Sequence, residues 1–126
     1  MRLLLDTSVL IHMVELPERL SRRAASVLRN LNNSLELSAV SVTEIAIKAG
    51  SGRLAFSAVI LREAMDELGI RILPFNADHA FRMFGLPRHH GDPFDRQIIA
   101  QALSEKIPVV TPDEKFRRYE GISVLW

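Results

Sequence analysis

Short apolar runs alternate along this chain with stretches in which apolar residues recur every three or four positions. The apolar runs predict strands, and the helical spacing predicts helices. Strands are expected at 2–6, 35–41, 70–75, 107–111 and 122–126. Helices are expected at 7–14, 21–31, 41–50, 57–69, 76–87, 92–106 and 113–119. Helices between most successive strands favour right-handed crossovers and therefore a parallel sheet.

The pattern predicts an α/β fold, a three-layer α/β/α sandwich with a central, largely parallel sheet in a single domain, 1–126. Strands of a sheet covered on both faces should be apolar on both faces. Glycines at 50 and 69 are expected to end two of the helices. Met65, Met83 and Phe84 are expected in the core.

Composition removes several classes of protein. The chain has 126 residues, of which 48% are hydrophobic and 25% charged, as in a globular domain. The absence of cysteine excludes disulfides, a thiol nucleophile and a thiolate zinc site. A net charge of +1 gives no sign of a strongly basic nucleic-acid binder. The first apolar run stops at Asp6, too soon for a secretory leader, so the expected location is cytoplasmic.

Four acidic residues stand close to the ends of predicted strands. Asp6 follows the first strand, and Glu44 falls in the first turn of the helix after the second. Asp113 follows the fourth strand, and Asp95 begins the helix that leads into it. Open parallel sheets bind ligands beyond the carboxyl ends of their strands. The four carboxylates are therefore expected to meet in one crevice.

Each acid also has a purely local explanation at a helix start. Asp6, Asp92 and Asp113 are candidate N-caps, and Glu44 completes an S-x-x-E capping-box pattern. Asp95 would favour the positive end of a helix dipole. Crowded together, however, carboxylates repel one another unless a cation compensates. Mg²⁺ and Mn²⁺ prefer oxygen ligands of this kind.

Four blocks of sequence resemble the PIN domain family and, within it, the VapC-type ribonuclease toxins of bacterial toxin–antitoxin pairs. The blocks are LLLDTSVLI, SAVSVTEIAIKAGSGRL, DPFDRQIIAQAL and VVTPDEKFRRYEGISVLW, in family order over nearly the whole chain. The resemblance implies a three-layer α/β/α fold and Mg²⁺- or Mn²⁺-dependent endoribonuclease activity, with metal-activated water hydrolysing RNA. It also implies a homodimer that is silenced by a cognate, VapB-like antitoxin protein.

The resemblance assigns the catalytic and metal-binding roles to the same four acids. They are Asp6 in DTS, Glu44 in VTEIAIK, Asp95 in DPFDR and Asp113 in TPD. Asp6 and Asp95 would be the most direct metal ligands. Glu44 and Asp113 would bind through water, complete a second metal site or help to deprotonate the nucleophile. Members of the family often have a basic residue directly before the last aspartate, where this chain has Pro112.

Other polar side chains adjoin these acids in the sequence. Three hydroxyls either orient carboxylates, contact phosphate or serve only the local structure: Thr7, Ser8 and Thr111. Four basic residues either bind the RNA backbone or belong to a solvated polar loop: Arg88, His89, His90 and Arg96. Arg96 is the first candidate for an RNA contact, because it directly follows Asp95.

Other functions fit less well. A haloacid-dehalogenase-like phosphatase needs a second aspartate two positions after its nucleophile, where this chain has Ser8, and a receiver domain needs a different set of acids. A serine hydrolase is excluded because there is no G-x-S-x-G elbow. Two alternatives stay open: a non-catalytic interaction module on the PIN fold, and a nuclease of RNA processing outside a toxin–antitoxin pair.

Overall fold

The computed structural model describes residues 1–126 and contains one five-stranded sheet in the order β3-β2-β1-β4-β5, with every neighbouring pair parallel. The strands are β1 (Arg2–Leu5), β2 (Ser34–Ser38), β3 (Ile70–Leu73), β4 (Val109–Val110) and β5 (Val124–Leu125). The α-helices are α1 (Thr7–Glu15), α2 (Arg22–Arg29), α3 (Ala39–Gly50), α4 (Ala58–Leu68), α5 (Ala77–Arg82) and α6 (Pro93–Glu105). Three short 3₁₀ helices complete the fold: η1 (Pro17–Arg19), η2 (Met83–Gly85) and η3 (Glu114–Arg118).

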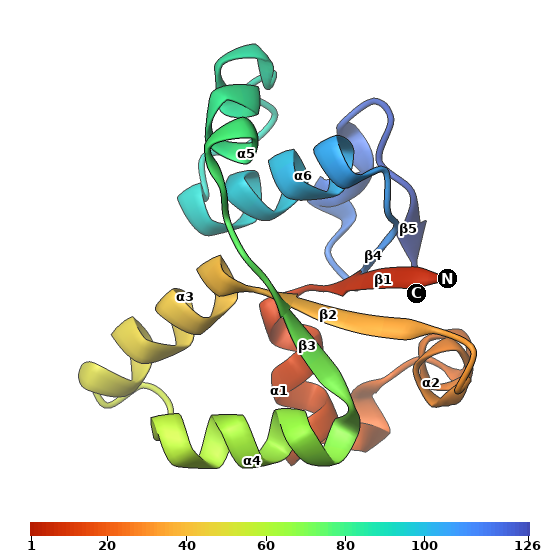
Figure 1. Cartoon of the computed structure of the whole chain (residues 1–126), viewed down its shortest axis with the longest axis vertical. Helices are drawn as coiled ribbons and strands as arrows, with labels where there is room; N and C mark the ends of the chain where they lie inside the picture. Colours follow the sequence, from red (N-terminus) through yellow and green to blue (C-terminus); the bar gives the residue numbers. More distant parts are fainter.

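Helices cover both faces of the sheet, so the predicted three-layer α/β/α fold is confirmed. Helices α1 to α4 lie on one face, and α5 and α6 lie on the other (Figure 1). A hydrophobic core lies on each face of the sheet. Because side chains alternate along a strand, Leu3 and Leu5 of β1 pack into the core on the side of α1 to α4, and Leu4 packs into the core on the side of α6. All three leucines are fully buried. No helix combines the length and the apolar character needed to cross a bilayer.

The expectation that strands are apolar on both faces is wrong for β2 and β3. Glu36 lies in the middle of β2, is buried, and receives two hydrogen bonds from Arg2 of β1, at 2.7 and 2.9 Å. β3 is an edge strand, and its Arg71 and Ile72 are exposed. The charged pair between β1 and β2 satisfies the buried carboxylate, which makes a polar residue tolerable inside the sheet.

The boundary between β2 and α3 lies earlier in the chain than predicted. Ser38 caps α3 by accepting a hydrogen bond from the backbone N–H of Val40 at 3.0 Å, so the helix begins at Ala39. Ser41 is consequently inside the helix, and the capping box predicted for it and Glu44 does not form. Glu44 falls in the second turn, which turns its side chain toward the carboxyl edge of the sheet.

Both helix ends predicted at glycines are confirmed. Gly69 ends α4 in the left-handed conformation, with φ 66°, as expected. α3 ends at Gly50, also as expected. The prediction that Phe84 belongs to the core is wrong, because η2 follows α5 at once and leaves Phe84 89% exposed. Met65 is buried as predicted, and Met83 is only partly buried.

The strand order places a crevice between β1 and β4. From β1 the chain builds outward through β2 to β3, then crosses to β4 on the other side of β1. This reversal is a topological switch point, where open parallel sheets bind their ligands. Asp6 follows β1 directly, and Thr111 follows β4 directly. The fold therefore brings these two side chains to the mouth of the crevice.

Candidate active site

Asp6 occupies the N-cap position of α1 but does not cap it. Its Oδ2 instead accepts hydrogen bonds from the hydroxyls of Thr111, at 2.7 Å, and Ser8, at 3.1 Å. The capping explanation for Asp6 is therefore wrong. Burial raises the pKa of Asp6, the two hydroxyls oppose this change, and the negative charge of Glu44 adds to it. A buried carboxylate held by hydroxyls is oriented without being neutralised.

Thr111 connects Asp6, at the end of β1, to Asp113, beyond the end of β4. Its Oγ1 donates to Asp6 and accepts a hydrogen bond from the backbone N–H of Asp113 at 3.0 Å. Asp113 caps η3, because its Oδ1 accepts a hydrogen bond from the N–H of Lys115 at 2.9 Å. The predicted cap is confirmed, and Asp113 also lines the pocket beside Asp6.

Glu44 is 7% exposed, and only one of its two carboxylate oxygens has a hydrogen-bond partner. Its Oε2 accepts a hydrogen bond from the Nζ of Lys48, one helical turn later, at 2.8 Å. Its Oε1 is buried and has no hydrogen-bond partner. A buried, unpartnered carboxylate oxygen is costly unless something else binds it. This atom is the clearest indication that the pocket binds a ligand.

Two aspartates at the start of α6 divide their tasks as the sequence suggested. Asp92 is the N-cap, and its Oδ1 accepts hydrogen bonds from the N–H groups of Phe94, at 2.9 Å, and Asp95, at 3.0 Å. Asp95, in the first turn, keeps its own carboxylate free for the pocket. Burial and the charges of the neighbouring carboxylates raise the pKa of Asp95 to about 7.

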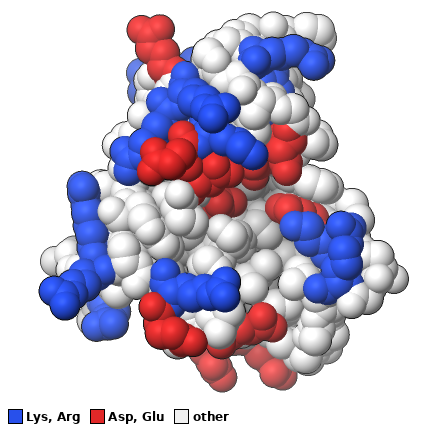
Figure 2. Space-filling view, turned by 180° about the vertical axis from the view of Figure 1, so that it is seen from behind, with Lys and Arg blue, Asp and Glu red and all other residues white.

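All four predicted acids line one pocket of about 230 Å³. Five of the nine lining residues are carboxylates, and Lys48 is the only cation among them: Asp6, Thr7, Ser8, Ile11, Glu44, Lys48, Asp92, Asp95 and Asp113. Figure 2 shows acidic side chains gathered in a hollow of the surface, with basic side chains around it. The pocket therefore concentrates negative charge well beyond what one lysine compensates.

A hard divalent cation fits this pocket in donor type and in charge. The donors are carboxylate and hydroxyl oxygens, which suit Mg²⁺ and Mn²⁺. The fit is incomplete in geometry, because no group of three or more Asp, Glu or His side chains is arranged to hold an ion directly. Mg²⁺ commonly keeps several of its waters and binds through one or two carboxylates. A hydrated ion is therefore the form that the pocket suits.

Two predicted supporting residues use their polar atoms within the fold. Thr7 lines the pocket, but its hydroxyl donates to Ser41 at 2.8 Å and so ties α1 to α3. Arg96 is absent from the pocket wall. Its guanidinium donates to the carbonyls of Leu86, at 3.2 Å, and Pro87, at 2.8 Å. These contacts favour a structural role for Arg96 over direct contact with RNA.

Sequence reasoning did not single out two residues of this site. Lys48 is one of them, although its i,i+4 spacing from Glu44 is a recognisable helix pairing. Tyr119 directly follows η3, and its hydroxyl is 2.7 Å from His90 Nδ1. Nothing in the sequence signals that contact. Burial lowers the pKa of His90.

Comparison with known proteins places the chain in a family. A model of the PIN domain matches residues 3–122. Because this match covers most of the chain, the chain belongs to the PIN domain family. A search of curated proteins gave no match.

Several solved structures share this fold, and VapBC complexes are among them. VapBC2 from Rickettsia felis, bound to a DNA fragment from its promoter, aligns with a TM-score of 0.75 and 19% identity over 98% of this chain and 97% of that one. DNA-bound VapBC from Salmonella typhimurium has a TM-score of 0.72, 17% identity and coverages of 98% and 96%. FitAcB from Neisseria gonorrhoeae has a TM-score of 0.66, 24% identity and coverages of 97% and 95%. At these identities the likeness establishes the fold.

Proposed function

We propose that this protein is a divalent-metal-dependent endoribonuclease and the toxin of a VapBC-type pair. The observation that carries the proposal is a pocket at the switch point of the sheet, with five carboxylates in its wall and the Oε1 of Glu44 buried without a partner. Membership of the PIN domain family, whose members are generally nucleases, supports the same reading.

The chain's own residues would divide the work as follows. Asp6 and Asp95 would bind a hydrated Mg²⁺ or Mn²⁺, with Thr111 and Ser8 keeping the Asp6 carboxylate in place. Glu44 and Asp113 would hold water molecules, and one of the two carboxylates would accept the proton of the attacking water. The bound cation would acidify that water and offset the charge that develops on the phosphate.

Binding of RNA would rely on the surface around the pocket. Phosphate contacts dominate the affinity of proteins for nucleic acids. Basic side chains surround the acidic hollow (Figure 2), and Lys48 reaches its wall. A backbone drawn toward this basic rim would bring a phosphodiester bond to the cation site.

The experiment is a cleavage assay on mixed cellular RNA with no metal, with Mg²⁺ and with Mn²⁺. We expect cleavage only with metal, and its loss in Asp6→Asn and Asp95→Asn. Asp66→Asn is the matched control, because Asp66 is an exposed acid of α4 outside the pocket. Cleavage that persists in both pocket variants would show that the assigned site is wrong. A folded protein that cuts no RNA under any condition would favour the non-catalytic alternative.

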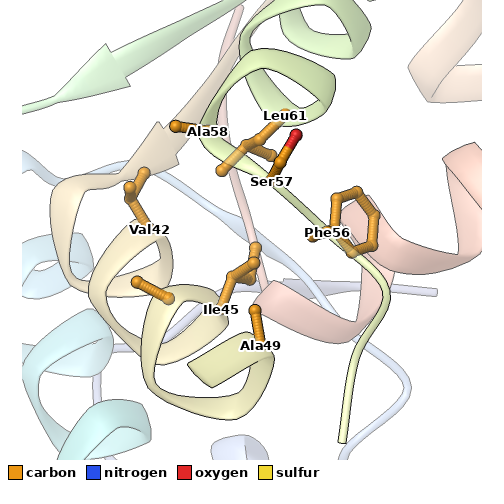
Figure 3. Close-up of a pocket in the computed structure, with 8 residues that line it drawn as sticks. Val42, Ile45, Ala49, Phe56, Ser57, Ala58 and Leu61 are labelled. Atoms are coloured by element: carbon orange, nitrogen blue, oxygen red, sulfur yellow. The ribbon is translucent and has the colours of Figure 1, made fainter. Parts of the chain in front are cut away.

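An antitoxin would have a groove to occupy between α3 and α4. Side chains of the two helices and of the segment between them face one another there (Figure 3). The groove has a volume of about 90 Å³ and is apolar except for Ser57. An apolar segment of an antitoxin would fit it, because seven of its eight lining residues are hydrophobic. Ala49→Glu, which places a charge in this groove, should abolish co-purification with the cognate antitoxin.

A homodimer would use the apolar surface of α5 and η2. Phe81 and Phe84 are 71% and 89% exposed, and their rings stack with centroids 6.3 Å apart. Exposed aromatic pairs of this kind commonly mark interfaces. Sedimentation analysis should find a dimer of the wild type and a monomer of Phe84→Glu; a wild-type monomer would contradict this assignment.

A further inference from the structure

The loop between η2 and α6 is fixed by one arginine. Arg96 donates to the carbonyls of Leu86 and Pro87, and its Nη1 also donates to the hydroxyl of Tyr119 at 3.1 Å. This loop contains His90 and ends at Asp92, the N-cap of α6. Arg96 therefore holds together the segment that precedes the acids of α6.

The two hydrogen-bond partners of the Tyr119 hydroxyl determine the tautomer of His90. Arginine can only donate hydrogen bonds, so the oxygen of Tyr119 accepts from Arg96. The only other hydrogen-bond partner of this buried hydroxyl is His90 Nδ1, at 2.7 Å. The phenolic proton is therefore donated to Nδ1, and the ring proton of His90 is on Nε2.

The protonated nitrogen of His90 faces a pocket carboxylate. Nε2 lies 3.5 Å from Oδ2 of Asp95, is buried and has no other partner. The His90 side chain is only 7% exposed, so water cannot easily replace this contact. At this distance Nε2 makes no hydrogen bond to Asp95, and its N–H acts on Oδ2 by charge–dipole attraction.

We propose that His90 is a positioning residue that directs Oδ2 of Asp95, with its tautomer fixed by Tyr119 and Arg96. This inference rests on the proposed function, in which Asp95 binds the cation. Asp92 fixes the backbone of Asp95 by accepting its N–H, and His90 fixes the side chain. Residues that orient metal-binding side chains in this way are typically worth 10- to 100-fold in metal affinity.

The test uses two substitutions that imitate different ring nitrogens. The amide nitrogen of His90→Gln replaces Nε2 and keeps a donor toward Asp95. The amide of His90→Asn lies near the position of Nδ1, keeps a partner for Tyr119 and leaves Asp95 without a donor. His89→Asn is the matched control, because His89 is exposed and contacts Tyr119 only through its ring, with centroids 4.8 Å apart.

The readout is the dissociation constant of Mn²⁺, measured by calorimetry on the folded chain without RNA. We expect His90→Gln and His89→Asn to stay within about threefold of the wild type, and His90→Asn to bind about tenfold more weakly. Tyr119→Phe removes the hydroxyl that fixes the tautomer of His90. Its dissociation constant for Mn²⁺ should lie between those of His90→Gln and His90→Asn. Asp95→Asn serves as the reference for a lost ligand.

The possible outcomes separate this inference from the proposed function. Equal affinity in wild type, His90→Gln and His90→Asn, with Asp95→Asn clearly weaker, would overturn the inference and leave the metal site intact. Equal weakening of both His90 variants would also overturn it, since packing alone would then explain the effect. A wild type that binds no Mn²⁺ would overturn the proposed function, and the inference with it.

Discussion

Two groups of carboxylates border the same sheet and are held in opposite ways. On the face covered by α6, Arg2 bridges Glu36, at 2.7 Å, and Glu105, at 3.1 Å. At the carboxyl edge, Asp6 is held by hydroxyls and Asp95 has no cation beside it. The first group forms a closed ionic network, and the second gathers charge that the fold does not neutralise.

The pKa shifts of the two groups run in opposite directions. Hydrogen bonds from His79 and Arg2 lower the pKa of Glu105, and its partner Arg2 has its own pKa raised by the bond to Glu36. Burial and neighbouring carboxylates raise the pKa of Asp95 to about 7. Strongly shifted groups that lie in a cleft are characteristic of functional sites. Charge on this chain thus stabilises one region and prepares the other for a ligand.

The largest expected effect comes from Asp95→Asn. Loss of this carboxylate should lower metal-dependent RNA cleavage by at least about 100-fold, because a group that binds the cation directly is removed. The free energy of unfolding of the metal-free protein should not fall, because the change removes a repulsive charge. Initial rates of cleavage and urea denaturation measure the two quantities. Lower stability with normal cleavage would contradict the comparison.

Glu36→Gln should give the opposite result. We expect a loss of about 2 kcal/mol in the free energy of unfolding, below the roughly 3–5 kcal/mol seen for fully buried pairs, since Arg2 is partly exposed and keeps Glu105. Metal-dependent cleavage at a temperature where the variant is folded should be unchanged. Denaturation together with a cleavage assay distinguishes the two roles; reduced cleavage in the folded variant would count against a purely structural network.

A smaller effect is expected when the support of Asp6 is removed. Thr111→Val keeps the shape of the side chain but deletes the hydroxyl that donates to Asp6. Metal affinity and cleavage should each fall about tenfold, as for other groups that orient a ligand. Thr43→Val is the control, because Thr43 is exposed and its hydroxyl bonds only to a carbonyl within α3. An equal effect of both substitutions would argue against the orienting role.

The raised pKa of Asp95 also predicts a pH dependence of stability. The pKa of Asp95 is about 7 when folded, against an ordinary value of 3.8, so the folded state binds the proton more tightly. Its contribution to stability is greatest below about pH 4, is lost as the pH rises toward about 7, and is constant above that. Metal-free wild type should therefore lose stability relative to Asp95→Asn across this window. If the difference in stability between the two proteins did not vary with pH, folding would not raise the pKa of Asp95.

The sequence predicted the place of the acids better than their local structure. Asp6 and Asp113 follow strand ends, and parallel strands bring such ends to one edge, so their meeting could be foreseen. Glu44 was placed one turn too early, because Ser38 was not recognised as the cap of α3. A cap three residues earlier changes the direction of every later side chain, yet it leaves the hydrophobic pattern almost unchanged.

Contacts between distant segments could not be predicted. Glu36 was missed inside β2 because its partner Arg2 is 34 positions away and only the strand register joins them. Tyr119 and His90 are separated by 29 positions, and their contact depends on how η3 packs beside the loop before α6. Such pairs follow from tertiary packing, on which local propensity and periodicity carry no information.

Thermal unfolding with and without Mn²⁺ tests the central claim most directly, in wild type and Asp95→Asn. A ligand at 100 times its dissociation constant stabilises a folded protein by about 2.7 kcal/mol, so saturating Mn²⁺ should raise the wild-type midpoint by several degrees. The midpoint of Asp95→Asn should hardly move. A wild-type midpoint unchanged by saturating Mn²⁺, or an equal rise in both proteins, would contradict the claim that this acidic pocket binds a catalytic cation.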